Sequence, residues 1–244
     1  MESSQTVRKL NKPNPDAVRD TFTRVAHRYD LANHLLSGGI DFSWRKKLVH
    51  IANQERCSSI LDLATGSGDV LFALKRGVNF NPDITGLDFC EPMLEQARKK
   101  RDELNLDAGK YPFILGDCLD LPFEDEKFDL VTISFGLRNL ADREKGLSEI
   151  YRVLKPGGRL IVLEFSQPYF WFSPIYYSYL RFVLPWLARF VTGDRDAYLY
   201  LGTSISNFPN RKELCGELEV VGFRNVCAKA LTFSIVSIHS GFKI

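Results

Sequence analysis

The spacing of apolar residues divides the chain into regions with different predicted structures. Near the N-terminus, apolar residues between positions 18 and 26 recur at helical intervals, and Asp16 is placed to cap that helix. A second helix is predicted over Ser43–Ala52. We therefore expect residues 16–54 to form a helical N-terminal cap.

Beyond this cap, short apolar runs alternate with segments that have helical spacing. The apolar runs predict strands over residues 59–64, 84–87, 113–115, 128–133 and 159–164. The segments between them predict helices over 69–76, 92–104 and 143–154 and turns over 65–68 and 155–158. Such alternation is typical of an α/β domain with a parallel sheet, here over residues 57–167.

The alternation breaks after Pro168, where an aromatic-rich insertion runs to about residue 200. Its first part, Tyr169–Phe190, holds 10 of the 30 aromatic residues, several at helical spacing around a proline that should kink the helix. Residues 201–244 then predict a helix over 211–221 capped by Gly222, and strands over 223–228 and 233–238 that finish the sheet. Neither an internal repeat nor a long linker is present, so one domain is the simplest organisation.

Composition excludes several classes of protein. The 244 residues are 45% hydrophobic and 25% charged, which is typical of a globular chain rather than a disordered or collagen-like one. The net charge of +2 argues against a binder of duplex nucleic acid, since such proteins usually carry a strong basic excess. The five cysteines form no C-x-x-C pair, so we expect neither a metal site nor disulfides, and free thiols fit a reducing compartment. We expect residues 1–15, which are polar and carry no secretory signal, to form a flexible tail. No apolar run is long enough to span a bilayer, so a cytoplasmic protein is expected.

A glycine turn joins the first predicted strand to the next helix. Gly66 and Gly68 let the backbone turn sharply and approach a ligand, and the helix N-terminus offers free N–H groups. Roughly 20 residues later, Asp88 ends the following strand, where a carboxylate can accept hydrogen bonds from both ribose hydroxyls. This outline fits two cofactors, NAD(P) and S-adenosylmethionine.

Two details favour S-adenosylmethionine. The dinucleotide pattern requires a third glycine for close packing and pyrophosphate approach, and Leu71 stands at that position. S-adenosylmethionine has no phosphate, and its sulfonium and zwitterionic tail favour nearby acids. Asp62 and Asp69 flank the turn.

Polar groups also follow the third and fourth strands. Asp117 and Cys118 end the third strand, where an acid can accept a hydrogen bond from an adenine amino group. Ser134 begins the Ser-Phe-Gly-Leu-Arg-Asn run at the end of the fourth strand. Ligands of open α/β sheets bind beyond the carboxyl ends of the strands, so these groups predict a single cofactor site.

These residues belong to longer runs that resemble a known family. The chain is similar to the quinone-biosynthesis C-methyltransferases, the family of demethylmenaquinone methyltransferase and 2-polyprenyl-6-methoxy-benzoquinol methylase, over nearly its whole length from about Phe22. The resemblance is carried mainly by Asp62-Leu-Ala-x-Gly-Ser-Gly-Asp69, Gly86-Leu-Asp88, Thr132-Ile-Ser-Phe-Gly-Leu-Arg-Asn139, Tyr151-Arg-Val-Leu-Lys-Pro-Gly-Gly-Arg-Leu160 and Leu163-Glu-Phe-Ser166. The glycine turn and the Leu-Lys-Pro-Gly-Gly run are general to class I methyltransferases. The Ser-Phe-Gly-Leu-Arg-Asn and Val-Leu-Glu-Phe-Ser runs are specific to the family.

The resemblance implies a class I S-adenosylmethionine-dependent methyltransferase with a Rossmann-like, doubly wound sheet. Its cofactor contacts would be Gly66, Ser67 and Gly68 in the turn, Asp88 at the ribose, Asp117 and Cys118 at the adenine, and Ser134. Its substrate would be a polyprenylated hydroquinone, with demethylmenaquinol favoured. Two departures leave the quinone open: Asp41-Phe42 stands where the family has His-Arg, and Leu231-Thr-Phe-Ser-Ile-Val236 stands where it has Leu-Thr-Gly-Gly-Ile-Val.

The implied reaction moves the sulfonium methyl to a ring carbon of the quinol, which becomes nucleophilic when a ring hydroxyl loses its proton. Arg138 is the first candidate to stabilise the phenolate or polarise a water that takes the proton, because an arginine itself is a poor base. Asn139 would orient that water and Tyr29 would hydrogen-bond the quinol oxygen. The alternatives are a salt bridge for Arg138, for example to Asp142, and helix packing for Tyr29. His239 matches a family histidine and is either a base or a structural hydrogen-bonding residue.

Two interpretations of the aromatic insertion are possible. It would form a lid over the polyprenyl tail, with transient contact to the inner face of a membrane, or it is a packed core stripe or a homodimer surface. The basic runs Arg45–Lys47 and Arg98–Arg101 would touch anionic lipid or are solvated helix faces.

Other functions stay open at this point. They are methylation of a 2-polyprenyl-6-methoxy-1,4-benzoquinol in ubiquinone biosynthesis, methylation of another small apolar acceptor such as a sterol or phenolic, and cofactor binding without catalysis in a quinone-biosynthesis assembly. A nucleic-acid amino-methyltransferase is disfavoured, because no Asn/Asp-Pro-Pro-Tyr/Phe run is present.

Overall fold

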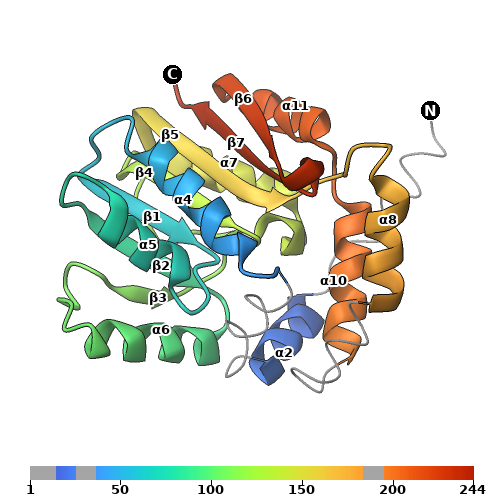
Figure 1. The fold of residues 1–244 in the computed structure, drawn as a ribbon. Coiled ribbons are helices and arrows are strands. Elements are labelled where there is room, and N and C mark those ends of the chain that lie inside the picture. Colours follow the sequence, from blue (N-terminus) through green and yellow to red (C-terminus); the bar gives the residue numbers. More distant parts are fainter. Residues whose placement is uncertain (1–14, 26–36, 184–194) are drawn as a thin grey trace.

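The computed structural model describes residues 15–25, 37–183 and 195–244, which form a mixed sheet with helices on both faces (Figure 1). The strands lie in the order β3-β2-β1-β4-β5-β7-β6. Their bounds are β1 Ser59–Leu63, β2 Asp83–Asp88, β3 Phe113–Leu115, β4 Phe128–Ser134, β5 Leu154–Phe165, β6 Arg224–Leu231 and β7 Val236–Phe242. The first five strands run parallel to their neighbours as predicted, and β7 runs antiparallel to β5 and β6.

The helices of the described residues follow the predicted pattern through the core. They are α2 Pro15–Val25, α4 Ile40–Ala52, α5 Asp69–Gly77, α6 Glu91–Glu103, α7 Arg143–Val153, α8 Ser173–Ser178, α10 Arg195–Asn207 and α11 Arg211–Val221. Three short helical segments are η2 Leu137–Asn139, η3 Tyr179–Val183 and η4 Thr232–Ser234. The predicted helices over 69–76, 92–104, 143–154 and 211–221 are confirmed to within one residue at each end.

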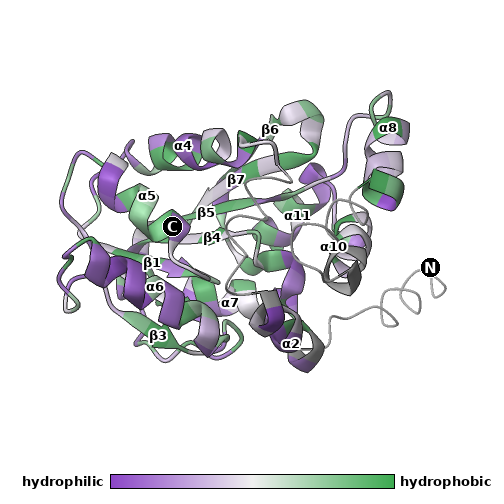
Figure 2. Cartoon of the chain, turned by 60° about the horizontal axis from the view of Figure 1, so that its bottom comes forward, coloured by the Kyte–Doolittle hydropathy of each residue, from purple (hydrophilic) through white to green (hydrophobic). Residues whose placement is uncertain are grey.

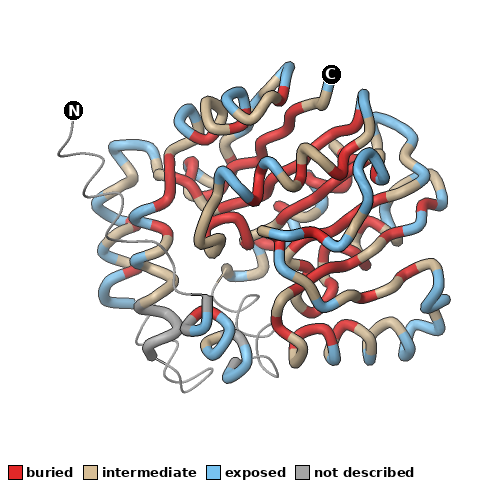
Figure 3. Tube along the Cα trace, turned by 180° about the vertical axis from the view of Figure 1, so that it is seen from behind, coloured by how far each residue is buried: buried red, intermediate tan, exposed pale blue. Residues whose placement is uncertain are grey.

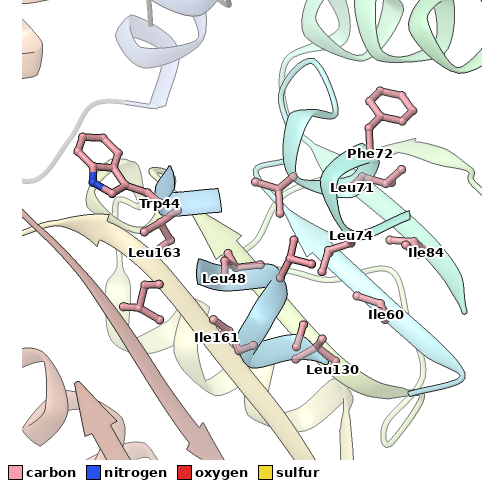
Figure 4. Close-up of a cluster of buried hydrophobic side chains, with 14 of the residues drawn as sticks. Trp44, Leu48, Ile60, Leu71, Phe72, Leu74, Ile84, Leu130, Ile161 and Leu163 are labelled. Carbon is pink, nitrogen blue, oxygen red and sulfur yellow. The ribbon is translucent and has the colours of Figure 1, made fainter. Parts of the chain in front are cut away.

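Side chains that alternate along the central strands build two separate cores. On one face of the sheet, Ile60, Leu130 and Ile161 pack against α4, α5 and α6 (Figure 4). On the other face, Leu61 and Val131 pack against α7 and α11. Both faces are covered, so the inner strands read as nearly continuous apolar runs. Figure 3 shows the strands as the most buried part of the chain, and Figure 2 shows α6 as mainly hydrophilic.

The strand order places a crevice between β1 and β4. The chain winds outward from β1 through β2 to β3 on one side, and outward from β4 to β5 on the other. The helices that follow β1 and β4 therefore leave on opposite faces of the sheet, which opens a gap at the carboxyl ends of these two strands. The glycine turn follows β1 and η2 follows β4, so both lie at this gap.

Two local predictions need correction. The predicted turn over residues 155–158 lies inside β5, because Leu154 already pairs with Phe128 and the register shifts before Arg159 pairs with Leu130. The extra residues bulge out of the strand, with Gly157 at a φ of 79°.

The last two strands lie closer to the C-terminus than predicted, at Arg224–Leu231 and Val236–Phe242. They are joined by η4, a turn whose residues Thr232, Phe233 and Ser234 have φ values of 44°, 54° and 70°. Two strands joined by so short a turn have to be antiparallel, which explains the reversal of β7. This turn occupies the run in which the chain departs from the family's Gly-Gly pattern.

The aromatic insertion forms a helical unit at the edge of the molecule. Figure 1 shows α8 and α10 side by side, and Tyr176, Leu180 and Ile205 form a small buried cluster between α8, η3 and α10. The sequence did not predict α10, which crosses the expected end of the insertion at residue 200. Pro185, Trp186 and Phe190, on which the predicted kinked helix depended, lie outside the described residues.

The N-terminal region differs from its prediction mainly at helix ends. α2 begins at Pro15, so Asp16 lies in its first turn rather than at the cap, and α4 begins three residues earlier than predicted, at Ile40. Tyr29 and residues 1–14 of the expected flexible tail lie outside the described residues, while Pro15 belongs to α2. Within the described residues, none of the helices combines the length and apolar character needed to cross a membrane.

Candidate functional site

A cavity of about 140 Å³ opens at the carboxyl ends of β1, β2 and β4. Six of the seven predicted cofactor residues line it: Gly66, Ser67, Asp88, Asp117, Cys118 and Ser134. The exception is Gly68, which does not line the cavity and instead lets the turn pack closely against Phe72. A Cβ at Gly68 would meet the Phe72 ring at 2.7 Å, and its φ of 84° is one that glycine adopts without strain.

The glycine turn is held in place by the next strand. The backbone N–H of Gly66 donates to Asp88 Oδ2 at 2.8 Å, and the N–H of Thr65 donates to the Leu87 carbonyl at 3.1 Å. Ser67 is buried at the cavity wall. These bonds fix the turn against β2, so α5 begins at Asp69 with its N-terminus directed toward the cavity.

Asp88 is the buried acid at the end of β2. Its Oδ1 accepts from the Cys90 N–H at 2.9 Å and its Oδ2 from Gly66. Burial raises the pKa of Asp88 to about 6, against the lowering effect of these backbone donors. Two backbone donors leave lone pairs for further donors, so Asp88 can accept from ribose hydroxyls as predicted.

Asp62 lies at the base of the same cavity and is also fully buried. It accepts from the hydroxyls of Thr65 and Thr132, each at 2.6 Å. Burial raises the pKa of Asp62 to about 6, and these two hydroxyl donors oppose the rise. Its role in the described contacts is to tie β1, the glycine turn and β4 together while placing an acid beneath the cavity.

The end of β3 supplies the opposite wall of the cavity. Asp117 Oδ1 accepts from the Leu119 N–H at 2.9 Å, which fixes the turn that carries Asp117 and Cys118. Burial raises the pKa of the Cys118 thiol to about 12, so it is neutral. A neutral, buried thiol beside a carboxylate suits the flat, weakly polar face and the amino group of an adenine ring.

Sequence reasoning missed two arginines that line the cavity, Arg19 on α2 and Arg45 on α4. Arg45 Nη2 contacts Asp41 Oδ2 at 2.6 Å and Asp69 Oδ2 at 3.2 Å. Asp69 Oδ1 also pairs with Lys100 Nζ at 3.0 Å. The Asp41–Arg45 spacing of four residues was a usable signal, because residues at i and i+4 share one face of a helix.

Ser134, at the end of β4, faces the cavity without a protein partner. Its buried hydroxyl makes no hydrogen bond in the described structure, although most buried hydroxyls are paired. An unpaired hydroxyl that lines a cavity beside five other predicted contacts is a site for a polar ligand atom. The residues present therefore fit a bound S-adenosylmethionine.

Arg138 lies in η2, just past Ser134, and its side chain is buried. Its Nη1 pairs with Glu164 Oε1 at 2.8 Å and also donates to the Phe135 carbonyl, and its backbone N–H donates to Glu164 Oε2 at 3.2 Å. Its Nε has no partner in the described structure. Arg138 thus forms a salt bridge, but with Glu164 rather than with Asp142, and it lies behind the cavity wall instead of lining it.

Asn139 is the predicted catalytic residue that does face the cavity. Its Oδ1 accepts a hydrogen bond from the Tyr200 hydroxyl at 3.0 Å, and its Nδ2 donates to the Phe135 carbonyl at 3.4 Å. Tyr200 lies on α10, so a helix that the sequence did not predict contacts the cavity at Asn139. The third predicted catalytic residue, Tyr29, lies outside the described residues.

His239 lies on β7, away from the cavity. Its Nε2 contacts the Arg211 carbonyl at 3.1 Å, and burial lowers its pKa to about 4. A neutral, hydrogen-bonded ring inside the sheet fits the structural alternative for this residue.

The two basic runs lie on helix faces and make ion pairs. Arg45 faces the cavity, while Lys46 and Lys47 are exposed. In the second run, Arg98 pairs with Glu91 at 2.5 Å and Lys100 with Asp69. Among the described residues, no group of three His, Cys, Asp or Glu side chains is arranged to hold a metal ion.

Comparisons with known proteins agree on one family. The model of the ubiE/COQ5 methyltransferase family matches residues 8–243. The chain is 44% identical over 221 residues to the demethylmenaquinone methyltransferase of Thermus thermophilus, covering 90% of this chain and 98% of the relative. It is 39% identical over 240 residues to the ubiquinone/menaquinone biosynthesis C-methyltransferase UbiE of Proteus mirabilis, covering 98% and 94%.

Solved structures with the same fold are more distant in sequence. A SAM-dependent methyltransferase from Thermotoga maritima aligns with a TM-score of 0.65 at 19% identity, covering 92% of this chain and 99% of that one. A phosphoethanolamine N-methyltransferase from Haemonchus contortus, solved with S-adenosylhomocysteine, aligns with a TM-score of 0.67 at 15% identity, covering 92% and 59%. These likenesses show the class I methyltransferase fold.

Proposed function

The chain belongs to the ubiE/COQ5 methyltransferase family, and from this premise we propose that it transfers the methyl group of S-adenosylmethionine to a ring carbon of a polyprenylated hydroquinone in quinone biosynthesis. The observation that carries the proposal is the cavity at the ends of β1, β2 and β4, which brings together six predicted cofactor residues beside the Arg138–Asn139 pair. When bound, the cofactor supplies an electrophilic methyl group.

The acids of the site are matched to the cofactor. Asp88 would accept from the ribose hydroxyls, Asp117 from the adenine amino group, and Asp62 would place negative charge below the sulfonium. Arg45, held by Asp41 and Asp69, would bind the methionine carboxylate, because guanidinium groups pair readily with carboxylates. Asp69, the acid at the start of α5, would accept from the amino group of the same tail.

The acceptor end has a buried ion pair, Arg138–Glu164, in place of acids that line the cavity. Arg138 places a buried cation behind Asn139, and buried charges act more strongly than charges in water. This cation would lower the free energy of the phenolate that makes the ring carbon nucleophilic. Asn139, fixed by the Tyr200 hydroxyl, would hold the quinol oxygen or the water that takes its proton.

The favoured acceptor is demethylmenaquinol. The relative from Thermus thermophilus carries the name demethylmenaquinone methyltransferase, and its identity to this chain is 44% against 39% for the Proteus mirabilis UbiE. Methylation of 2-polyprenyl-6-methoxy-1,4-benzoquinol is the second candidate, favoured by the dual name of the UbiE relatives. We also propose that the reaction takes place at a membrane surface, because a polyprenyl tail partitions into lipid. The homodimer considered for the aromatic insertion is a separate proposal.

A direct assay tests the function. Purified enzyme is incubated with S-adenosylmethionine and reduced demethylmenaquinone of short and long tail, with the benzoquinol as the competing acceptor, and products are identified by mass spectrometry. We expect methylation of the naphthoquinol. Exclusive methylation of the benzoquinol would move the enzyme to ubiquinone biosynthesis, and methylation of neither would support a different apolar acceptor.

A single-turnover measurement separates catalysis from cofactor binding alone. With enzyme in excess over labelled cofactor, a catalyst transfers the label to the naphthoquinol, whereas a binding protein that serves an assembly leaves the label on the cofactor. Cofactor affinity is measured in the same samples by calorimetry, so that loss of binding is not mistaken for loss of chemistry.

A further inference from the structure

Several large apolar side chains lie exposed along one short stretch of the chain and one turn. Phe170 is 88% exposed, Ile175 62%, Trp171 54% and Phe233 52%. Tyr169 and Phe182 are exposed as well. We call these six residues the exposed aromatic surface. Neighbouring exposed apolar side chains of this kind mark an interaction site.

Three residues of this surface, Tyr169, Trp171 and Phe233, contact one another although they come from distant parts of the sequence. The Phe233 ring lies 5.5 Å from the Trp171 ring and 4.9 Å from that of Phe172, and Trp171 lies 6.3 Å from Tyr169. The backbone ties the two segments together, since the Tyr169 N–H donates to the Phe233 carbonyl at 3.0 Å. The surface is therefore a built feature rather than a set of isolated side chains.

The turn that presents Phe233 adopts a conformation that its residues do not favour. Thr232, Phe233 and Ser234 all have φ values between 44° and 70°. Glycine adopts this region without strain, whereas a β-branched or bulky residue rarely does. The turn is held by its neighbours: Trp44 Nε1 donates to Thr232 Oγ1 at 2.8 Å, and Ser234 Oγ donates to the Gln167 carbonyl at 2.9 Å. Backbone strain that is retained at an exposed aromatic residue indicates a functional role for its ring.

The charges around this surface suit an anionic partner. Residues 165–183 contain no acidic residue and one basic residue, Arg181, which stacks on the Phe182 ring. The turn over 232–235 carries no charge, and Arg211 lies 5.7 Å from the Tyr169 ring. Tyrosine and tryptophan, with an apolar body and a polar edge, concentrate where hydrocarbon meets water.

The surface also lies next to the acceptor end of the site. α8 exposes Ile175 and buries its neighbour Tyr176 in a cluster that packs against Phe165, and the Arg138 guanidinium lies 5.2 Å from the Phe165 ring. One short helix thus links the exposed aromatic surface to the side chains that pack around Arg138.

We propose that the exposed aromatic surface docks the enzyme onto a bilayer that contains anionic lipid, with Phe170, Trp171 and Phe233 entering the headgroup layer. This deepens the proposed function, because an acceptor with a polyprenyl tail lies in that bilayer and its ring then meets the Arg138 end of the cavity from the membrane side. Interfacial anchoring of this type combines buried apolar area with attraction to anionic lipid.

The test compares co-sedimentation with vesicles of phosphatidylcholine alone and of phosphatidylcholine with phosphatidylglycerol. The key variant is Phe170→Ala/Phe233→Gly, because glycine at position 233 removes the ring and relieves the positive φ, so the fold is not put at risk. We expect it to bind mixed vesicles at least about tenfold more weakly than the unchanged protein, from the area lost. Val220→Ser, which removes an apolar side chain that is 79% exposed on α11, is the matched control and should bind as the unchanged protein does.

Three results would overturn the proposal: no binding of the unchanged protein to either vesicle, equal binding by the double variant, or equal loss in the control. Size-exclusion chromatography tests whether the surface binds a second copy of the chain instead. If the unchanged protein is a dimer, the double variant is a monomer and vesicle binding is the same in both, the surface is a dimer interface. Methyl transfer to a quinol with a single prenyl unit, in the absence of lipid, should be the same in both proteins. If neither protein methylates any quinol, the proposed function fails, while vesicle binding still decides the docking surface.

Discussion

The two ends of the candidate site differ in charge and in origin. The cofactor end is lined by acids near the carboxyl ends of β1 and β2 and after β3, together with Arg45, and burial raises the pKa of Asp62 and Asp88 to about 6. The acceptor end has the buried guanidinium of Arg138, paired with Glu164, and neutral tyrosines near it on α8 and α10. The difference matches the two reactants, since one brings a positive sulfonium and the other becomes a negative phenolate. Under the proposed function each end would stabilise the charge of its own ligand, so substitutions at the two ends should have separable effects.

The largest effect is expected at the acceptor end, from Arg138→Ala. Loss of the cation that stabilises the phenolate should lower kcat by at least about 100-fold, while the Kd of S-adenosylmethionine changes little. Initial rates at saturating cofactor and calorimetry measure the two quantities. Near-normal turnover would remove Arg138 from the mechanism.

A second variant guards this prediction against a folding artefact. Arg138→Ala leaves the buried Glu164 without its cationic partner, and breaking a buried pair costs about 3–5 kcal/mol. Arg138→Gln/Glu164→Gln removes both charges together and should keep the fold while kcat stays low. Arg143→Ala, which breaks an ion pair with Glu217 away from the cavity, is the matched control and should keep its kcat.

The next effect is expected at the cofactor end, from Asp88→Asn. A hydrogen bond to a charged group contributes about 1.5–3 kcal/mol, so the affinity for S-adenosylmethionine should fall about 10- to 100-fold. Turnover at saturating cofactor should change much less, the reverse of the Arg138 result. Asp129→Asn is the control, because Asp129 is bound by Ser58 and Lys155 at the opposite end of the sheet. A Kd unchanged in Asp88→Asn would exclude Asp88 from the ribose site.

A smaller effect should connect the two ends through α10. Tyr200→Phe removes the hydroxyl that fixes Asn139 and should lower kcat about tenfold, since one hydrogen bond contributes about 1 kcal/mol or slightly more. Tyr177→Phe, which removes a tyrosine hydroxyl bonded to Gln167 instead, should leave kcat unchanged.

A double-mutant cycle shows whether Tyr200 acts through its partner. In an Asn139→Ala background, Tyr200→Phe should have no further effect on kcat, because the oxygen that it fixes is already gone. Additive losses would show that Tyr200 acts on the substrate directly or through packing.

The smallest effect is the pH dependence of cofactor binding. In the proposed site Asp88 would bind the cofactor as a carboxylate. Burial raises its pKa to about 6 in the free protein, so it is increasingly protonated as the pH falls. Affinity should therefore rise as the pH rises through 6 and level off above it, with a loss of about fourfold at pH 5.5 relative to pH 7. Calorimetry over this range tests the sign, and Asp88→Asn should flatten the profile. A profile that stays steep in that variant would assign the titration to Asp62.

Much of the cofactor end was predictable because its signals are local. The strand before Gly66, the turn and the start of α5 are consecutive in sequence, and turn chemistry and apolar period are properties of short segments. Asp88, Asp117 and Ser134 followed from the rule that parallel strands end at one edge, so six of seven contacts reached the cavity. The seventh, Gly68, serves the close packing of Phe72 instead.

The contacts of the acceptor end could not be predicted, because the residues that form them are far apart in the sequence. The sequence marked Arg138 but not its partner Glu164, which is 26 residues away, and it gave no sign that Tyr200 would reach Asn139 across 61 residues. The helix that carries Tyr200 was missed, since its packing against α8 and η2, and not its own periodicity, accounts for its burial. Arg45 was read as part of a basic run, and only its meeting with Asp69 showed that it lines the cavity.

By itself, the sequence determined the α/β core, the glycine turn, the choice of S-adenosylmethionine and the family to which the chain belongs, because these depend on residues close together along the chain. Only the tertiary structure decided which charges face each other, that Arg138 lies buried against Glu164, and that Phe233 stands beside Trp171 on an exposed surface. Such pairings depend on how strands and helices far apart in sequence pack together. A local sequence pattern does not indicate which distant residue it will contact.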